Sequence, residues 1–288
     1  MEISYSFHLS AKKHAITNIN KLKQCSKHNL RKYQSEEYEK EKITTLIGTD
    51  NIVNDVKKIY KKEFKEALAK YNEGKRDDRK IKDYMQHISD SRTDLASEII
   101  IQIGDKEFWA NKTEEEKRKM EPIYKKQIEK LNEICPEFKL ANCTIHYDEH
   151  SVHAHLVGVP IAEGYTKGLA KQVAKTKVFT AERLSEIQRI MHDYTNEQIK
   201  EFEIFQDLQI KKKEKGRNKD IPKKSLDEYY RIIQENKEMK EEINKLTEYI
   251  DRLKAKIKYI QEWLKAEKQI DEDLEIEYKR KRELDIER

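Results

Sequence analysis

The chain has 288 residues, of which 36% are hydrophobic and 40% are charged, and its formal net charge is +5. Because an average soluble domain is about 45–50% apolar and about 25% charged, we expect a small globular core with an exposed helical extension. The longest apolar run, from Leu156 to Ala162, is far shorter than the roughly 20 residues of a membrane helix. Three cysteines without metal spacing argue against a disulfide framework, so we expect a cytoplasmic protein with no membrane segment.

The first half of the chain predicts two strands separated by helical segments. Residues 3–9 alternate apolar and polar side chains, which is the period of a half-buried strand. Residues 50–71 place apolar side chains at helical spacing, and the polar residues 73–93 predict a loop with a short helix. Residues 94–103 end in β-branched side chains and stop at Gly104, which predicts the second strand.

The second half predicts two helices around a β-hairpin. A helix is expected over residues 113–134, because Thr113 followed by Glu116 forms a capping-box pattern. Residues 142–147 and 152–160 are expected to pair as a hairpin with a short turn. A further helix is expected from about residue 180 to 203, with Thr180 as its N-cap.

Four of the nine histidines lie within ten residues, in the segment HYDEHSVHAH from His146 to His155. Residues two apart on a strand point to the same face, so His153 and His155 share a face, and the partner strand brings His146 beside them. Three neutral imidazoles suit a divalent transition metal and leave coordination positions open for a substrate. The spacing therefore predicts a catalytic metal site at these three histidines.

The residues next to these histidines in the sequence are expected to have different roles. Asp148 is expected to accept a hydrogen bond from the remaining N–H of a metal ligand, and Glu149 to take part in catalysis. His150 falls in the turn and is expected to be exposed. Cys143 points away from His146 on a regular strand, which predicts a place in the core.

Beyond residue 225, apolar residues follow one another in alternating steps of three and four. This spacing gives a heptad seam with apolar a and d positions, which predicts a coiled coil. Asn236 fills one a position, and a polar residue there fixes the register of a two-stranded coil. We expect residues 225–288 to form a homodimer; the alternative is a long helix folded back on its own domain. The apolar members of the seam are Tyr229, Ile232, Met239, Ile243, Leu246, Ile250, Leu253, Ile257, Ile260 and Leu264.

Two basic segments are candidate DNA contacts. The first follows the hairpin directly, and we expect a phosphate backbone to run along it beside the reacting centre. Its basic residues, with no acid among them, are Lys167, Lys171, Lys175 and Lys177. The second segment, residues 211–224, is a basic linker that either contacts phosphates or stays solvated.

The histidine segment, with VGVP downstream, resembles the motif H-x-D-E-x-x-P-H-x-H of the Pre/Mob (MobV-type) relaxases, which act in plasmid mobilisation and recombination. The chain matches every fixed position except the proline, which is Val152 here. The H-N-x-R motif of that family is matched by His28, Asn29 and Arg31. The resemblance covers roughly residues 1–235.

This resemblance implies an α+β protein with three parts. Residues 1–210 would form an HUH endonuclease domain, an antiparallel sheet flanked by helices; 211–224 would be the linker, and 225–288 the coiled-coil helix. The implied activity is conjugative plasmid mobilisation: with Mn²⁺ or Mg²⁺, the enzyme nicks one DNA strand at the transfer origin. A covalent 5′-phosphate–protein bond is kept so that the strand can be religated.

The resemblance also implies that the nucleophile is the motif histidine, His28. Histidine is nucleophilic when neutral, and an unperturbed pKa of about 6.5 leaves it mostly neutral at cytoplasmic pH. Arg31, three residues on, is expected to share a helical face with His28 and to hold a phosphate, while Asn29 positions substrate or ring. Tyr33 and Tyr38 lie close in the sequence and stay as rival nucleophiles.

Two other functions fit the same residues. A rolling-circle replication initiator uses the same kind of site, usually with a tyrosine, and a covalent-adduct test on a His28 variant separates the two enzymes. A DNA-binding coiled-coil protein with an inactive site is the alternative outside enzymes. The intact set of three histidines argues against that alternative.

Overall fold

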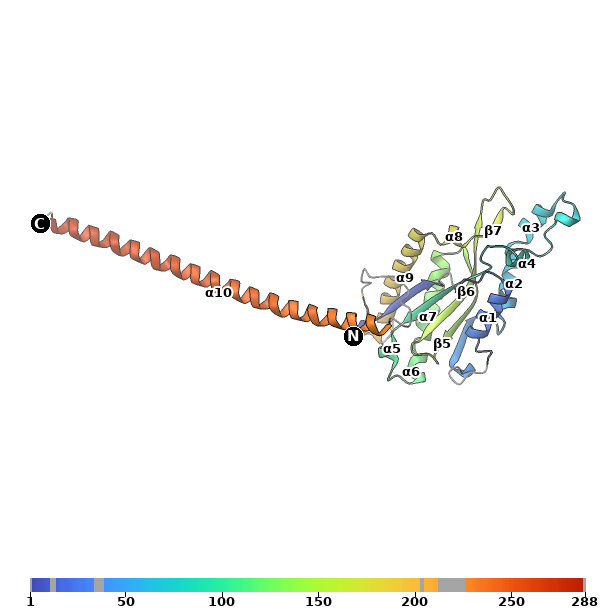
Figure 1. Ribbon diagram of the computed structural model, residues 1–288, viewed down its shortest axis with the longest axis horizontal. Helices are drawn as coiled ribbons and strands as arrows, with labels where there is room; N and C mark the ends of the chain where they lie inside the picture. Colours follow the sequence, from blue (N-terminus) through green and yellow to red (C-terminus); the bar gives the residue numbers. More distant parts are fainter. Residues whose placement is uncertain (1, 11–13, 34–38, 203–204, 212–225, 287–288) are drawn as a thin grey trace. The chain divides into compact units, whose positions relative to one another are not determined.

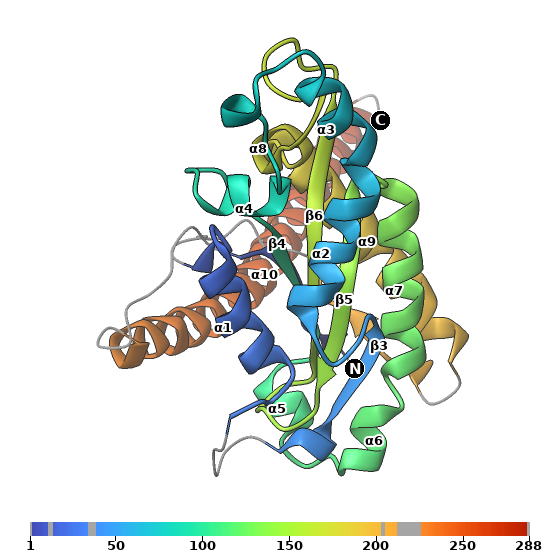
Figure 2. The same cartoon turned by 90° about the vertical axis from the view of Figure 1, so that its right-hand side faces the viewer.

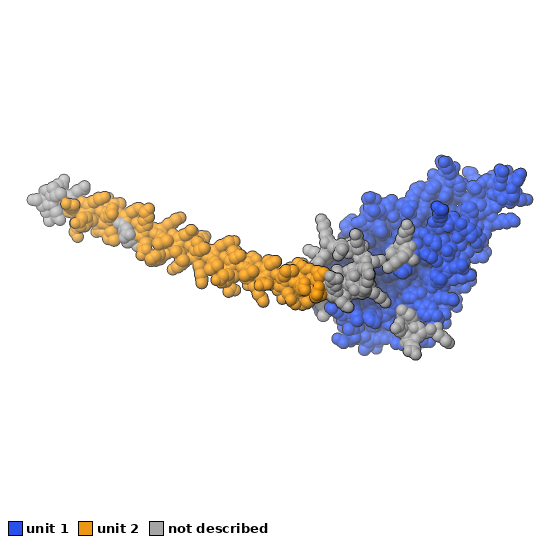
Figure 3. All heavy atoms as spheres, viewed as in Figure 1, with its two compact units in different colours: residues 1–213 blue, residues 214–288 orange. Residues whose placement is uncertain are grey.

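The computed structural model describes residues 2–10, 14–33, 39–202, 205–211 and 226–286. The chain divides into two compact units, Met1–Lys213 and Glu214–Arg288, which Figure 3 colours separately. The predicted division into a domain, a linker and a coiled coil stays a prediction, because almost all of the linker lies outside the described residues. None of the described helices has both the length and the apolar character that crossing a membrane requires.

An antiparallel sheet forms the centre of the first unit. Its strands follow the order β2–β4–β6–β5–β3, and β7 pairs with the far end of β6. A separate pair, β1 with β8, runs parallel. The strands are β1 (Glu2–Ile3), β2 (Tyr5–Leu9), β3 (Ile43–Ile47), β4 (Ser97–Ile103), β5 (Phe138–His146), β6 (His153–Glu163), β7 (Lys171–Val173) and β8 (Gln209–Ile210).

Helices cover both faces of this sheet, as Figures 1 and 2 show for α7 and α9 on one side and α1 and α2 on the other. Alternate side chains such as Ile99, Ile101 and Leu156 are fully buried in the apolar cluster on the first side. Val157 and Val159 belong to a second cluster on the opposite side. This is the predicted α+β class, an antiparallel sheet flanked by helices.

The helices of the first unit are mostly short. They are α1 (Ile19–Asn29), η2 (Lys40–Lys42), α2 (Ile52–Glu63), α3 (Lys65–Asn72), η3 (Asp77–Arg79), α4 (Tyr84–Ser89), α5 (Lys106–Trp109), α6 (Glu114–Arg118), α7 (Glu121–Ile134), α8 (Lys175–Val178) and α9 (Ala181–Glu201).

Several local predictions are confirmed. β5 and β6 form the expected hairpin and place His146 directly opposite His153. Thr113 makes the predicted capping box with Glu116, and Thr180 caps α9 through its side chain. Cys143 is fully buried in the core, and His150 is exposed.

Other boundaries were wrong for identifiable reasons. The helix expected over residues 113–134 is split into α6 and α7, because Pro122 in the first turn of α7 has no N–H to bond the carbonyl of Arg118, where α6 ends. The helix expected over 50–71 divides at Phe64 into α2 and α3. The strand expected over 3–9 divides into β1 and β2, which pair with different strands. The strand β3, which pairs with β5, was not predicted from the sequence.

The second unit contains one helix of 61 residues, α10 (Leu226–Ile286). The predicted apolar seam lies along it, and its side chains from Ile232 to Leu264 are between 40% and 60% exposed. A single helix cannot bury such a stripe on itself. The predicted helix is therefore confirmed, while its pairing with a second helix stays a prediction.

Candidate active site

His28 lies in the last turn of α1, and the chain reverses direction immediately after it. The N–H of Lys32 bonds to the carbonyl of Lys27, and the N–H of Arg31 bonds to the carbonyl of His28. These paired bonds form a Schellman motif, which places one residue in the left-handed region, usually glycine. Here that residue is Arg31, with φ of 48°. The expectation that Arg31 shares a helical face with His28 was therefore wrong, because α1 has already ended at Asn29.

A buried ion-pair cluster holds Arg31 in this conformation. Its Nε and Nη2 atoms donate to the two carboxylate oxygens of Asp148 at 2.7 Å each, and Nη2 also donates to Glu149 Oε1 at 2.7 Å. A left-handed residue other than glycine costs about 1–2 kcal/mol, which these charge-assisted bonds offset. The Arg31 side chain is 0% exposed and its guanidinium faces these carboxylates, while the expected phosphate contact stays a prediction.

The three histidines of the hairpin gather on the sheet face toward α1. The ring centroid of His146 lies 5.3 Å from that of His153 and 4.5 Å from that of His155, and the last two are 4.9 Å apart. Strand register explains the grouping, because His146 and His153 are directly paired and His155 lies two residues along β6. The structure thus brings together the three predicted ligands.

Each of these three rings uses one of its nitrogens in a hydrogen bond to an oxygen outside the group. Carbonyl and carboxylate oxygens can only accept, so the bonded nitrogen carries the proton and the other nitrogen faces inward. The bonds run from His146 Nε2 to the Asn29 carbonyl at 2.9 Å, from His153 Nδ1 to the Ser151 carbonyl at 2.8 Å, and from His155 Nδ1 to Glu98 Oε1 at 2.9 Å.

The inward nitrogens fit a metal ion. Burial lowers the pKa of His146, and burial together with the neighbouring His155 lowers the pKa of His153 to about 3, so both rings are neutral near pH 7. His146 Nδ1 and His155 Nε2 are buried and have no hydrogen-bond partner among the described residues. Leaving such groups unsatisfied costs about 1–3 kcal/mol each, and a cation bound to their lone pairs removes that cost.

Glu149 places a carboxylate beside the inward nitrogens. Its Oε1 lies 3.5 Å from His146 Nδ1 and 3.9 Å from His28 Nε2, and its Oε2 lies 3.7 Å from His153 Nε2. Burial acts to raise the pKa of Glu149, but the facing His146 ring and the Arg31 guanidinium outweigh it and lower that pKa. The carboxylate is therefore an anion in contact range of the site.

Two sets of possible ligands consequently overlap at His146. One set is His146, Glu149 and His153; the other is His28, His146 and His155. Within each set, one ligand atom per residue lies within 4.8 Å of the others. Glu149 and His28 are thus candidate ligands beside the predicted three, which do not form such a set by themselves among the described residues.

Glu98 of β4 is the site residue that the sequence analysis missed. Its Oε1 accepts from His155 and from the Asn29 side chain at 2.8 Å, and its Oε2 accepts from Ser10 at 3.1 Å. Burial acts to raise the pKa of Glu98, but the His155 ring and these donors lower it to about 2. Glu98 takes the ring-orienting place expected of Asp148. The only feature of the sequence that could have indicated Glu98 is an acidic residue directly before three isoleucines of β4.

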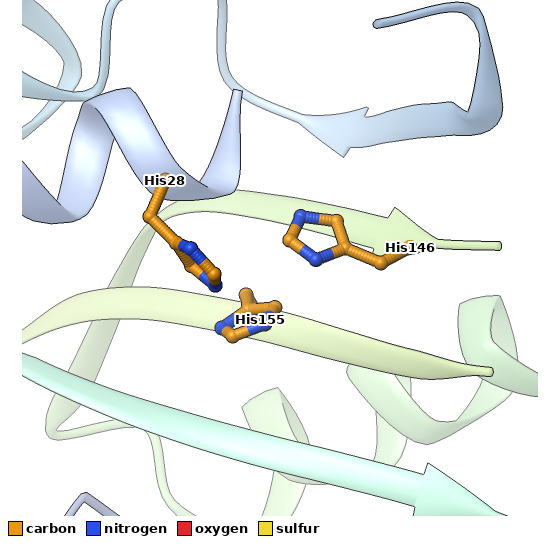
Figure 4. A group of neighbouring side chains, drawn as sticks. All are labelled: His28, His146 and His155. Atoms are coloured by element: carbon orange, nitrogen blue, oxygen red, sulfur yellow. The ribbon is translucent and has the colours of Figure 1, made fainter. Parts of the chain in front are cut away.

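His28 faces this cluster from α1, opposite His146 of β5 and His155 of β6 (Figure 4). Its ring centroid lies 5.6 Å from that of His146 and 5.4 Å from that of His155. Burial, and then the neighbouring His155, Arg31 and His146 side chains, lower the pKa of His28 to about 4. The side chain is 38% exposed, so a neutral imidazole is open to a substrate.

Of the two rival tyrosines, Tyr33 and Tyr38, the structure describes only Tyr33. Tyr33 forms a hydrogen bond of 2.8 Å between its hydroxyl and His28 Nδ1. Tyr38 lies outside the described residues.

The basic segment after the hairpin does not lie beside the histidines. β6 is eleven residues long, so the segment begins at its far end, about 26 Å from His155 at a rise of 3.3 Å per residue. Lys171 pairs with Glu63 at 2.8 Å and Lys175 with Asp94 at 2.9 Å. Lys177 donates to the carbonyl of Glu163, and Lys167 is exposed. The expected position next to the reacting centre was therefore wrong, while DNA binding by these lysines stays a prediction.

We predict that Arg31→Ala lowers the free energy of unfolding by about 3–5 kcal/mol, because it leaves buried carboxylates without their cation. Arg31→Gly loses the same contacts but relieves the left-handed backbone, so it should be less destabilising by about 1 kcal/mol. Urea denaturation of the two variants measures both effects. A wild-type stability for Arg31→Ala, or no advantage of glycine over alanine, would contradict this account of the turn.

Comparisons with known proteins identify one family. The family model of the plasmid recombination enzymes (Mob_Pre) matches residues 8–204, more than half of the chain. None of the curated proteins compared with the chain matches it.

Solved structures of one relaxase domain are similar in part. The Mn-bound MobM relaxase domain with 22-nucleotide oriT DNA of plasmid pMV158 is 17% identical, with 80% of this chain and 99% of that chain covered and a TM-score of 0.47. The same domain with 26-nucleotide oriT DNA is 18% identical, with 77% and 98% covered and a TM-score of 0.41. The family match extends over both histidine motifs, and the chain belongs to the plasmid recombination enzyme family.

Proposed function

We propose that this protein is a metal-dependent relaxase that nicks one strand of plasmid DNA at its transfer origin and keeps the 5′-phosphate on His28. The observation that carries the proposal is the arrangement of the four rings. The ring centroids of His146, His153 and His155 lie 4.5–5.3 Å apart. The centroid of the neutral and accessible His28 ring lies 5.6 Å from that of His146 and 5.4 Å from that of His155.

His146 would hold the cation through Nδ1, and His153 and His155 through Nε2, with Glu149 within reach of the same site. The cation supplies Lewis-acid stabilisation of the charge that develops on the phosphate oxygens. Imidazole ligands favour a transition metal, and the MobM relaxase domain solved with 22-nucleotide oriT DNA is Mn-bound, so we propose Mn²⁺, with Mg²⁺ as the alternative.

His28 would attack the scissile phosphate with the lone pair of Nε2. A bond forms between Nε2 and phosphorus, and the bond from phosphorus to the 3′-oxygen breaks. The electron pair leaves with the 3′-oxygen, which takes a proton from water, and the 5′-phosphate stays on the histidine. The low pKa of His28 supports this role, because it keeps the imidazole neutral and nucleophilic near pH 7. Arg31 and Asp148 fix Glu149 and the end of α1 while this happens.

We predict that His153→Ala weakens Mn²⁺ binding by about 100-fold or more and abolishes nicking, while most DNA binding is kept, because one ligand is lost. Titration calorimetry with Mn²⁺ measures the affinity. His150→Ala is the matched control, since His150 is exposed in the same hairpin and should bind Mn²⁺ like the wild type. Equal affinities of the two variants would refute the assignment.

A second prediction separates the two possible roles of His28. If His28 is the nucleophile, His28→Ala forms no covalent DNA adduct, yet its Mn²⁺ affinity stays within about twofold of wild type. The wild-type adduct should be lost in mild acid, because a phosphoramidate is acid-labile and a phosphotyrosine is not. A large loss of Mn²⁺ affinity would make His28 a ligand, and an acid-resistant adduct would exclude it as the nucleophile.

We further propose that α10 pairs with a second copy of itself in a parallel two-stranded coil. The a positions include Ile243 and Ile250 and the d positions Leu246 and Leu253, a combination that favours parallel dimers. These four side chains are 40–60% exposed on the single helix. Parallel pairing also places Asn236 against its own copy, where the two amides can bond each other.

Truncation after residue 213 tests this pairing. The shortened chain should be monomeric. Its unfolding temperature should equal that of the first unit in the full-length chain, because the sheet and both apolar clusters lie within residues 1–213. Sedimentation equilibrium gives the mass, and circular dichroism gives the unfolding curve. A monomeric full-length chain at micromolar concentration would rule out the dimer.

A further inference from the structure

We propose that Tyr33 is a positioning residue of the nicking reaction, which selects the tautomer of His28 and supports the positive charge that its ring acquires. This inference rests on the proposed role of His28 as nucleophile. Tyr33 was a rival candidate for the nucleophile; here it assists His28 instead.

The turn after α1 brings the two side chains together. The Schellman bonds at Arg31 and Lys32 reverse the chain, so Tyr33 returns alongside the last turn of the helix. The side chain of Lys32 anchors this turn on the carbonyl of Asp50. The two rings lie 6.5 Å apart between centroids, and Tyr33 Oη lies 2.8 Å from His28 Nδ1. Both side chains are partly exposed, Tyr33 at 37% and His28 at 38%.

A proton on His28 Nδ1 at this contact would leave Nε2 as the nitrogen that can react. A neutral imidazole carries one proton, and only the other nitrogen has a lone pair in the ring plane. Nε2 is the nitrogen on the side of the cluster, 3.9 Å from Glu149 Oε1, so it is the one that can reach a phosphate held there. The proton must then sit on Nδ1, and the phenolic oxygen of Tyr33 is placed to accept it in a hydrogen bond.

The same bond becomes stronger as the reaction proceeds. When the Nε2 lone pair forms the bond to phosphorus, the ring becomes cationic while the proton stays on Nδ1. A hydrogen bond from a cation is about twice as strong as a neutral one, so Tyr33 stabilises the transition state more than the free enzyme. Tyr33 Oη lies at the nitrogen opposite the attacking one, a poor place for a rival nucleophile.

The test is Tyr33→Phe in the full-length chain, with Tyr71→Phe as a matched control because Tyr71 is also partly exposed but belongs to α3. We expect a single-turnover nicking rate lower by about 10- to 100-fold, the range that follows from losing a hydrogen bond to a charged group. The adduct should still form and stay acid-labile. Nitrogen-15 spectra of His28 should show a smaller share of the Nδ1–H tautomer, which a merely structural role would not change.

Two results would overturn the inference in distinguishable ways. Wild-type rate and an unchanged tautomer in Tyr33→Phe would remove Tyr33 from the reaction and leave His28 as nucleophile. Complete loss of the adduct, with Mn²⁺ and DNA binding kept, would make Tyr33 the nucleophile and refute the proposed role of His28 as well. The control should match wild type in both rate and spectrum.

Discussion

The site depends on one buried guanidinium. Arg31 bonds Asp148 across 117 positions of sequence and so joins the end of α1 to the turn between β5 and β6. Without that cation, Asp148 and Glu149 would be two adjacent carboxylates in a poorly solvated turn, and charge repulsion would drive them apart. The same bonds stabilise a left-handed backbone at Arg31 and hold the end of α1, where His28 lies, against this turn. Ion pairing, backbone geometry and the position of the candidate nucleophile are therefore a single constraint.

The sheet and its surroundings complete the arrangement by fixing each ring from a different element. The carbonyl of Asn29 comes from α1, that of Ser151 from the hairpin turn, and the carboxylate of Glu98 from β4. Each acceptor holds a proton on the outer nitrogen and turns the inner nitrogen to the centre. A cation would meet oriented ligands, so little reorganisation would be needed on binding. That orientation is what a site for phosphate chemistry needs, because the stabilising charge must already be in place when the bond breaks.

The local periodicities explain which parts of this site could be predicted. Alternation on a strand and pairing across a hairpin depend on neighbours in sequence, so the grouping of His146, His153 and His155 followed from spacing alone. Glu98 could not be found in this way, because which strand lies beside β6 is decided by the fold of the whole sheet. Arg31 at a position that usually carries glycine has no signature in sequence. The place of the basic segment was missed because the hairpin strand runs on for eleven residues.

The central claim is that His28 carries the DNA after nicking. It is tested most directly by trapping the covalent adduct with origin DNA and Mn²⁺, digesting it under neutral conditions and locating the nucleotide by tandem mass spectrometry. We expect the nucleotide on His28, in the peptide that ends at Arg31. A nucleotide on Tyr33 or Tyr38 would contradict it.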